Sequence, residues 1–252
     1  EAVAAYDEAR LAARRSGSAD AEGRLLLNCA VTLRQGGQFD RALALSRQGR
    51  ALSAGDPGDS SHQLIADLVV ARDEAEAGCF ASALATLELT LPGFEDAGAG
   101  FWSQACRMVM VPLWLHLGQP ARAVPLLRDE PDELPAWLRA DRLLLRLDLA
   151  RTLQQAPPAG ALPAALDLAD TDPQRRPALV VRALGHLPPA EAVALADRLV
   201  ADLLQQERLG VLAALHVHRG EALLALGRSD DAAIDAEDLL ALLGQGIAPD
   251  SM

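Results

Sequence analysis

The sequence contains no lysine, only three cysteines and very few aromatic residues. All 23 basic residues are arginine, a bias that indicates a GC-rich and therefore bacterial coding sequence rather than a binding function. Cys29, Cys79 and Cys106 lie far apart and form no CxxC pair. We therefore expect them to be small buried apolar side chains in a reducing compartment. Because aromatic residues make up only 3% of the chain, the core must consist mainly of Leu, Ala and Val.

Long apolar runs and excess positive charge are also missing. No run reaches the ~18–20 apolar residues that a membrane span needs, and the longest candidate covers only residues 108–117. No signal peptide is visible, so we expect a cytoplasmic chain without membrane contact. The net charge of −12 repels phosphate backbones, which argues against direct nucleic-acid contact. The chain begins at Glu1 rather than Met, and we expect it to be a fragment of a longer protein.

The residues that are abundant favour α-helix. Leu, Ala, Arg and Glu dominate the sequence, and all four are strong helix formers. Stretches that alternate apolar and polar residues, as a half-buried strand would, are few and short. A chain of 252 residues suffices for one large or two ordinary domains. The composition therefore predicts an all-α fold.

A glycine followed five positions later by an alanine recurs along the chain. The clear copies are Gly37 and Ala42, Gly78 and Ala83, Gly118 and Ala123, and Gly227 and Ala232. The first three copies follow one another at intervals of about 40 residues, a period typical of a helical solenoid. The much longer gap before the last copy suits three such units, and degenerate copies at Ala159–Ala164 and Leu187–Ala192 fit inside it. The interval between these two is shorter than one unit, so the register between positions 130 and 190 stays open.

Gly and Ala at this spacing have a steric explanation. Two antiparallel helices joined by a tight turn bring their backbones close together near the turn. Gly supplies the left-handed conformation that ends the first helix. Ala at the start of the second helix leaves room for the two helices to approach each other. We therefore interpret each copy as the turn of a helical hairpin.

The hairpins resemble the tetratricopeptide repeat (TPR), a helix-turn-helix unit with Gly at the turn and Ala, an aromatic residue and Ala along its second helix. Three segments carry the resemblance: Ala2, Tyr6 and Ala9; Gly37, Phe39 and Ala42; and Gly78, Phe80 and Ala83. The units here are longer than the usual ~34 residues, and the turns at Gly118 and Gly227 lack the aromatic residue. The pattern is therefore similar to the long, divergent repeats of large bacterial regulatory proteins. This resemblance implies a right-handed α-solenoid with a concave groove.

The repeat predicts one unpaired helix and six antiparallel helix pairs in a single domain spanning residues 1–252. The unpaired helix covers residues 1–15, and the pairs cover residues 19–54, 60–95, 100–129, 135–169, 173–206 and 208–244. Segments rich in Gly, Pro, Ser and Asp separate them at residues 16–20, 54–61, 96–100, 129–135 and 171–174. Residues 245–252 form a tail. Pro112 and Pro125 lie inside helical patterns and should kink or end those helices.

The resemblance also implies which residues line the groove, because in tetratricopeptide arrays the first helix of each pair faces inward. Counting back from the turn glycines gives the candidate partner-binding residues Arg24, Asn28, Val31, Arg34, Arg72, Glu76, Met108, His218 and Glu221. Arg24, Asn28, Arg34 and Arg72 would form a basic patch that suits an acidic peptide or a chain terminus, since Arg binds carboxylates through two parallel hydrogen bonds. Alternatively, these Arg residues form ion pairs with neighbouring Asp and Glu on a solvated face, which is the commoner arrangement. A chaperone-tail clamp is disfavoured, because Val69 replaces the second Asn of that motif and Lys is absent.

No catalytic or metal-binding motif stands out. His216 and His218 lie two positions apart, which places them on nearly opposite faces of a helix. His218 and Glu221 share a face, but two ligands without a third are weak support for a metal site. His62, His116 and His186 have no partner at a motif spacing, and no nucleophile elbow, phosphate-binding loop or HExxH is present. We therefore expect no enzyme activity, no cofactor and no bound metal.

Three functions remain open at this point. The first is a non-catalytic scaffold that binds a protein or peptide in its groove, as the TPR module of a larger bacterial transcriptional or signalling regulator. The second is a structural scaffold subunit of an envelope assembly or secretion complex. The third is an enzyme with an unrecognised site in the groove. Self-association of the array is compatible with each of them.

Overall fold

The computed structural model describes residues 2–53, 60–128 and 134–249. These residues form α-helices and one short 3₁₀ helix and contain no strand, which confirms the all-α fold class. The helices are α1 (Ala2–Arg15), α2 (Ala19–Gln35), α3 (Phe39–Ser53), α4 (Ser60–Glu76), α5 (Phe80–Asp96), α6 (Gly100–His116), α7 (Pro120–Ala123), η1 (Val124–Leu127), α8 (Ala136–Thr152), α9 (Ala161–Ala169), α10 (Arg176–Leu184), α11 (Pro189–Gln205), α12 (Leu209–Ala225) and α13 (Ser229–Gly244).

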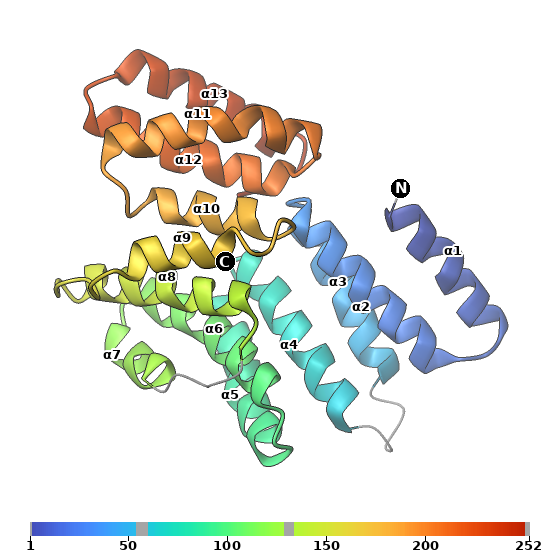
Figure 1. The fold of residues 1–252 in the computed structure, drawn as a ribbon. Helices are drawn as coiled ribbons and strands as arrows, with labels where there is room; N and C mark the ends of the chain where they lie inside the picture. Colours follow the sequence, from blue (N-terminus) through green and yellow to red (C-terminus); the bar gives the residue numbers. More distant parts are fainter. Residues whose placement is uncertain (1, 54–59, 129–133, 250–252) are drawn as a thin grey trace. The chain divides into compact units, whose positions relative to one another are not determined.

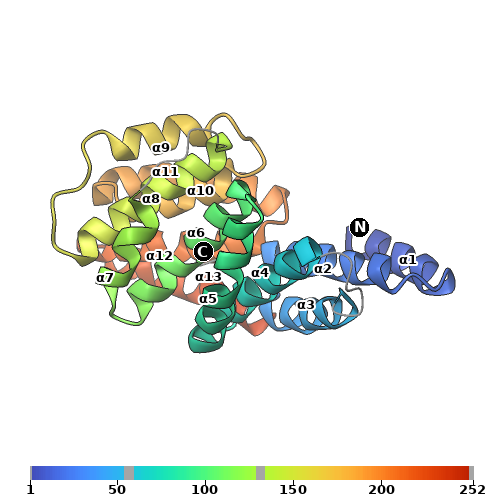
Figure 2. The same cartoon turned by 90° about the horizontal axis from the view of Figure 1, so that it is seen from below.

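The chain divides into two compact units, and the boundary falls inside α6 after Leu113. In the first unit each of the helices α1 to α4 packs against the next one along the chain, and α2 also contacts α4 (Figures 1 and 2). Within it, α6 packs on α5, where Phe94 stacks on Trp102 with ring centroids 6.2 Å apart. Neighbouring helices in sequence are therefore neighbours in space, as expected for hairpins joined by short turns.

The four recurring glycines lie at the turns. Gly37, Gly78, Gly118 and Gly227 have positive φ values of 74°, 79°, 67° and 74°. At the first turn the Gly37 N–H donates to the Arg34 carbonyl (2.9 Å) and the Gln38 N–H donates to the Leu33 carbonyl (2.9 Å), which is the Schellman pattern of a helix end. The alanines five positions later, Ala42, Ala83, Ala123 and Ala232, are all buried. Each repeat therefore has a left-handed residue that ends one helix and a small residue where the next helix crosses it.

Two glycines mark a close approach of α2 and α3 in the first unit. A Cβ added at Gly49 would lie 2.9 Å from the Gly23 carbonyl oxygen and 2.9 Å from Leu27 Cγ. A Cβ added at Gly23 would lie 3.0 Å from the Gly49 carbonyl oxygen. The two glycines therefore let the backbones of α2 and α3 touch, which explains why both positions lack a side chain inside a helix.

The second unit contains the end of α6, the short helices α7 and η1, and the helices from α8 to α13. α8 packs on α9, α11 on α12 and α12 on α13, while α10 contacts α8, α9, α11 and α12 (Figure 1). Their buried faces form one hydrophobic core of Leu, Val and Ala, in which Leu203, Leu215 and Leu223 are completely buried. Helices α8, α10 and α12, the first members of their pairs, therefore contact one another in succession, as α2 and α4 do in the first unit.

The uncertain register after position 130 is resolved by the structure. α8 ends in a turn where Gln154 has a φ of 54°, and α9 begins after Gly160, whose φ is 70°. Ala164, expected at the helix crossing, is exposed, whereas Ala165 is buried. The predicted copy at Ala159–Ala164 is therefore one residue out of register, because a longer loop separates α8 from α9. At the other degenerate copy, Ala192 is buried as expected.

One other expectation needs correction. Cys79 is exposed, because it precedes α5 in the turn, whereas Cys29 and Cys106 are buried. Of the two prolines expected to kink or end a helix, Pro112 lies inside α6, which continues to His116, and Pro125 lies in the 3₁₀ turn that follows the end of α7. The predicted breakers at residues 54–61 and 129–135 and the tail at 245–252 lie partly outside the described residues.

Candidate functional site

In the first unit, a buried ion pair joins two of the first helices. Arg34 on α2 donates from Nε to Oδ1 of Asp73 on α4 at 3.0 Å, and the Asp73 side chain is fully buried. Burial raises the pKa of Asp73, while Arg34 and the Ser46 hydroxyl act in the opposite direction. The Arg34 guanidinium, expected to face a partner, is thus directed into the contact between α2 and α4. A role in partner binding stays a prediction for this residue.

The other candidates of the first unit differ in exposure. Arg24 is exposed and contacts Asp20 Oδ2 at 2.9 Å and His62 Nδ1 at 3.0 Å. Asn28 is exposed one turn further along α2. Val31 on α2 and Arg72 and Glu76 on α4 are half-buried, whereas Met108 on α6 is buried. Arg24 and Asn28 are therefore the members of the expected patch that are most accessible to a partner.

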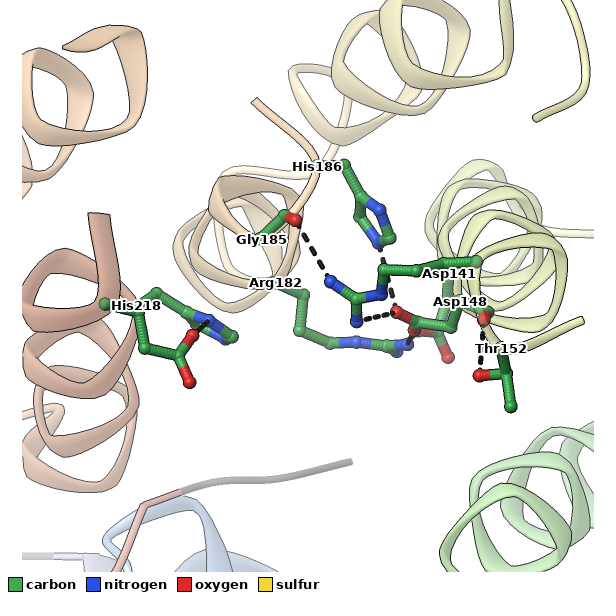
Figure 3. A network of polar contacts seen from close by, with 9 residues as sticks. Asp141, Asp148, Thr152, Arg182, Gly185, His186 and His218 are labelled. Carbon is green, nitrogen blue, oxygen red and sulfur yellow. Dashed lines mark hydrogen bonds and ion pairs between the residues drawn. The ribbon is translucent and has the colours of Figure 1, made fainter. Parts of the chain in front are cut away.

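A larger polar cluster lies in the second unit, where α8 and α10 meet (Figure 3). Asp148 on α8 is its centre: Oδ1 contacts His186 Nε2 at 3.1 Å and accepts from Arg151 Nη2 at 3.0 Å. Arg182 on α10 donates to Asp148 Oδ2 at 3.3 Å and also to Asp141. Arg151 donates in addition to the Gly185 carbonyl at 3.2 Å. We call Asp141, Asp148, Arg151, Arg182 and His186 the α8–α10 cluster.

The electrostatics of this cluster keep its central carboxylate charged. Burial by itself would raise the pKa of Asp148, but the hydrogen bond with His186 and the positive charges of Arg182 and Arg151 hold that pKa below its ordinary value. Asp148 is therefore ionised at neutral pH. Its carboxylate has partners on both helices, which fix its position.

The predicted pair of His218 and Glu221 lies on α12, which packs beside α10. Figure 3 shows His218. His218 Nδ1 is 3.7 Å from a Glu221 carboxylate oxygen, and the Glu221 side chain is 71% exposed. Burial lowers the pKa of His218, and the neighbouring Glu221 opposes this effect. Together with Arg151, whose side chain is 64% exposed, these residues present groups of both signs along α8, α10 and α12.

The α8–α10 cluster is not foreseen from the sequence motifs, but the repeat period contains a signal for it. Arg34 and Asp73 are 39 positions apart in the chain, and Asp141 and Arg182 are 41 positions apart. The pair of Asp148 and His186 has a similar separation. Arg34 and Asp73, like Asp141 and Arg182, lie on adjacent first helices, and His186 lies in the turn directly after α10. Searching the charge pattern at this separation would have paired His186 with Asp148.

A second polar cluster lies in the last hairpin, between α12 and α13. Asp235 Oδ1 is 2.8 Å from His216 Nδ1 and accepts from Arg219 Nη1 at 2.7 Å. Arg219 also donates from Nε to Asp197 Oδ1 on α11 at 2.8 Å. Both His216 and Asp235 are buried. The sequence relates His216 only to His218, and its contact with α13 is visible only in the structure.

Comparison with known proteins leaves the function to be argued from these clusters. No protein-family model matches the chain, and no curated protein matches it. Among the described residues, no helix combines the length and the apolar character needed to cross a bilayer. Chemically, the clusters offer fixed carboxylates and partly exposed guanidinium groups, which suit recognition of a polar partner.

Proposed function

We propose that this chain is a non-catalytic protein-interaction module, a TPR-like right-handed α-solenoid that binds a protein or peptide along its first helices. The observation that carries the proposal is the contact between successive first helices, α2 with α4, α8 with α10, and α10 with α12. In solenoids such contacts align one helix of each repeat and create an extended recognition face. The recurring turn geometry at the four glycines supports the same repeat.

The polar groups on these first helices suggest the chemistry of the partner. Arg24 and Arg151 have side chains that are 49% and 64% exposed, and each is already oriented by an acidic neighbour. A carboxylate-bearing segment can accept hydrogen bonds from such guanidinium groups. The chain as a whole is acidic, so these sites are local exceptions to its charge. An acidic peptide segment is thus the partner that we propose, with no direct contact to nucleic acid.

A binding assay with peptides of defined charge tests this proposal. Fluorescein-labelled peptides of equal length but acidic, neutral or basic composition are titrated with the protein, and fluorescence anisotropy reports binding. We expect the acidic set to bind best, and Arg151→Glu to weaken that binding by at least ~5-fold because it replaces an attractive charge with a repulsive one. Arg198→Glu, at an exposed position on the second helix α11, is the matched control and should change little.

An equal loss of acidic-peptide affinity in Arg151→Glu and Arg198→Glu would show that only net charge matters. The proposal that the first helices form the recognition face would then be rejected. Equal binding by all three peptide sets would reject an acidic partner. Circular dichroism of each variant establishes that helix content is unchanged, so a loss of binding can be assigned to the altered charge.

We place this module in a larger bacterial, cytoplasmic regulator of transcription or signalling. This part of the proposal rests on the resemblance of the long repeats to those of such regulators. The coding sequence around the chain tests it: a nucleotide-binding loop or a helix-turn-helix in the same protein would support it. A lipoprotein signal or a β-barrel domain would point instead to an envelope assembly.

A further inference from the structure

The last hairpin holds a group of potential metal ligands that the proposed recognition face does not use. His216 on α12 and Asp235 and Asp238 on α13 each offer one ligand atom, and these atoms all lie within 4.8 Å of one another. Asp235 and Asp238 are three positions apart, so both side chains lie on the face of α13 that is turned towards α12. His216 and Asp235 are buried, whereas Asp238 is exposed. One side of the group is therefore open to solvent.

The second observation is an unsatisfied oxygen inside this group. Asp235 is only 1% exposed, and its Oδ2 atom is buried without a hydrogen-bond partner. Its Oδ1 atom already has two partners, His216 and Arg219. Buried carboxylate oxygens almost always have a partner, because leaving one without any is costly. The Oδ2 atom thus calls for a cationic or donor ligand.

We propose that His216, Asp235 and Asp238 bind one divalent transition-metal ion between α12 and α13. One imidazole and two carboxylates are a ligand set that zinc, manganese or iron accepts. Calcium and magnesium are disfavoured, because they prefer oxygen ligands and six or more of them. Water completes the coordination sphere on the side of the exposed Asp238.

Arg219 carries a positive charge that disfavours a metal ion at this site, since its guanidinium contacts Asp235. It contacts the Oδ1 atom and not Oδ2, and its Nε is also held by Asp197. Asp197, Asp235 and Asp238 together supply three carboxylates against this single guanidinium. The local charge therefore stays negative around the ion. His216 is neutral in the metal-bound form, because the metal takes a nitrogen lone pair.

A metal here would act as a cross-link. Two ligands come from α13 and one from α12, so the ion joins the helices of the terminal hairpin. Because the unfolded chain does not hold these three groups together, binding stabilises the folded hairpin. The proposal concerns a structural ion and is independent of whether the first helices bind a peptide.

Zinc titration of chelator-treated protein tests the site. Isothermal calorimetry with zinc chloride should show one ion per chain, and the melting temperature followed by circular dichroism should rise with zinc. Asp238→Asn removes an exposed ligand without disturbing the core, and we expect zinc binding to weaken by at least ~10-fold and the thermal shift to vanish. His216→Gln should have the same effect. His218→Gln, on the same helix but outside the group, is the matched control and should retain wild-type binding.

Two results would overturn the proposal. One is zinc affinity in Asp238→Asn that equals the affinity of the wild type. The other is an equal loss in His218→Gln, which would assign zinc to scattered surface ligands. If His216→Gln fails to fold, Asp238→Asn decides alone, since its side chain lies on the surface. Peptide binding by the zinc-free protein keeps this test separate from the test of the recognition face.

Discussion

The contact between α2 and α3 allows a quantitative test of how the hairpins are built. Replacing Gly49 with Ala places a methyl group 2.9 Å from the Gly23 carbonyl oxygen and 2.9 Å from Leu27 Cγ. The oxygen belongs to the backbone of α2, so it can move only if the helix moves. We expect Gly49→Ala to push α2 and α3 apart at this crossing.

Two opposing effects determine how much Gly49→Ala changes the stability of the α2–α3 contact. Ala is favoured over Gly inside a helix by ~1 kcal/mol. Overpacking a well-packed contact costs typically about 1–3 kcal/mol. Because both obstructing atoms lie well inside the normal contact distance, we expect the upper part of this range, about 2–3 kcal/mol. The net expectation is a destabilisation of about 1–2 kcal/mol, which corresponds to roughly a 5- to 30-fold increase in local opening.

Native-state hydrogen exchange followed by mass spectrometry measures this opening locally. It suits a chain of two compact units, whose global unfolding need not be two-state. Peptides from α2 and α3 should exchange faster in Gly49→Ala, whereas peptides from α11 to α13 should not change. Gly220→Ala is the matched control, because its new methyl group would meet only Asp235 Cβ at an ordinary 3.7 Å.

Gly220→Ala should stabilise α12, because Ala favours the helix more than Gly does, and hydrogen exchange in α12 should therefore slow. Unchanged or slower exchange of α2 and α3 in Gly49→Ala would refute the close backbone contact. Faster exchange in both variants would show that any Ala in place of a helical Gly disturbs the fold, and that the Gly23–Gly49 contact has no special role.

Three further predictions concern charge and turns. Arg34→Met removes the guanidinium that donates a hydrogen bond to the buried Asp73 and should destabilise the α2–α4 contact by ~3–5 kcal/mol, measured by hydrogen exchange. Much of the loss should be recovered when Asp73→Leu is added. The pKa of Asp148 is lowered in the folded state, so its ionised form stabilises the fold at pH values above the unfolded pKa of about 3.9. This contribution is lost as pH falls through the folded pKa. The difference in unfolding free energy between wild type and Asp148→Asn should therefore shrink at low pH, which urea unfolding at a series of pH values measures. Glu207 has a φ of 54°, a conformation that Gly adopts more easily than Glu. Glu207→Gly should therefore raise the free energy of local opening around the α11–α12 turn by ~1 kcal/mol, which slows hydrogen exchange there. The same change at Glu237, which is exposed and helical, should accelerate exchange.

Turn chemistry made much of the helix layout predictable. Gly at a positive φ is required by the helix ends at Gly37, Gly78, Gly118 and Gly227, so the sequence marks those turns directly. The turns at Gln154 and Glu207 use the same left-handed conformation without glycine. A search for Gly does not mark those two turns. Between α8 and α9 the longer loop also shifts the copy by one residue, to Gly160 and Ala165.

The candidate sites were less predictable than the helices. Position within a helix indicated which residues belong to the first helices, including Arg24, His218 and Glu221. It could not indicate that Arg34 is buried against Asp73, because the two residues lie on different helices that meet only in the folded chain. Reading the sequence helix by helix does not show such pairs, whereas comparing charged residues about one repeat apart would have brought Arg34 and Asp73 together.

The two polar clusters of the second unit differ in a way that bears on function. In the α8–α10 cluster the central carboxylate has partners for both oxygens, and those partners include groups from the neighbouring repeat. Its charge is therefore used to join repeats, and only its outer groups, such as Arg151, remain accessible to a partner. In the last hairpin, by contrast, Asp235 keeps one buried oxygen without a hydrogen bond. Among these two carboxylates, a ligand would therefore find an oxygen without a partner at Asp235 and none at Asp148.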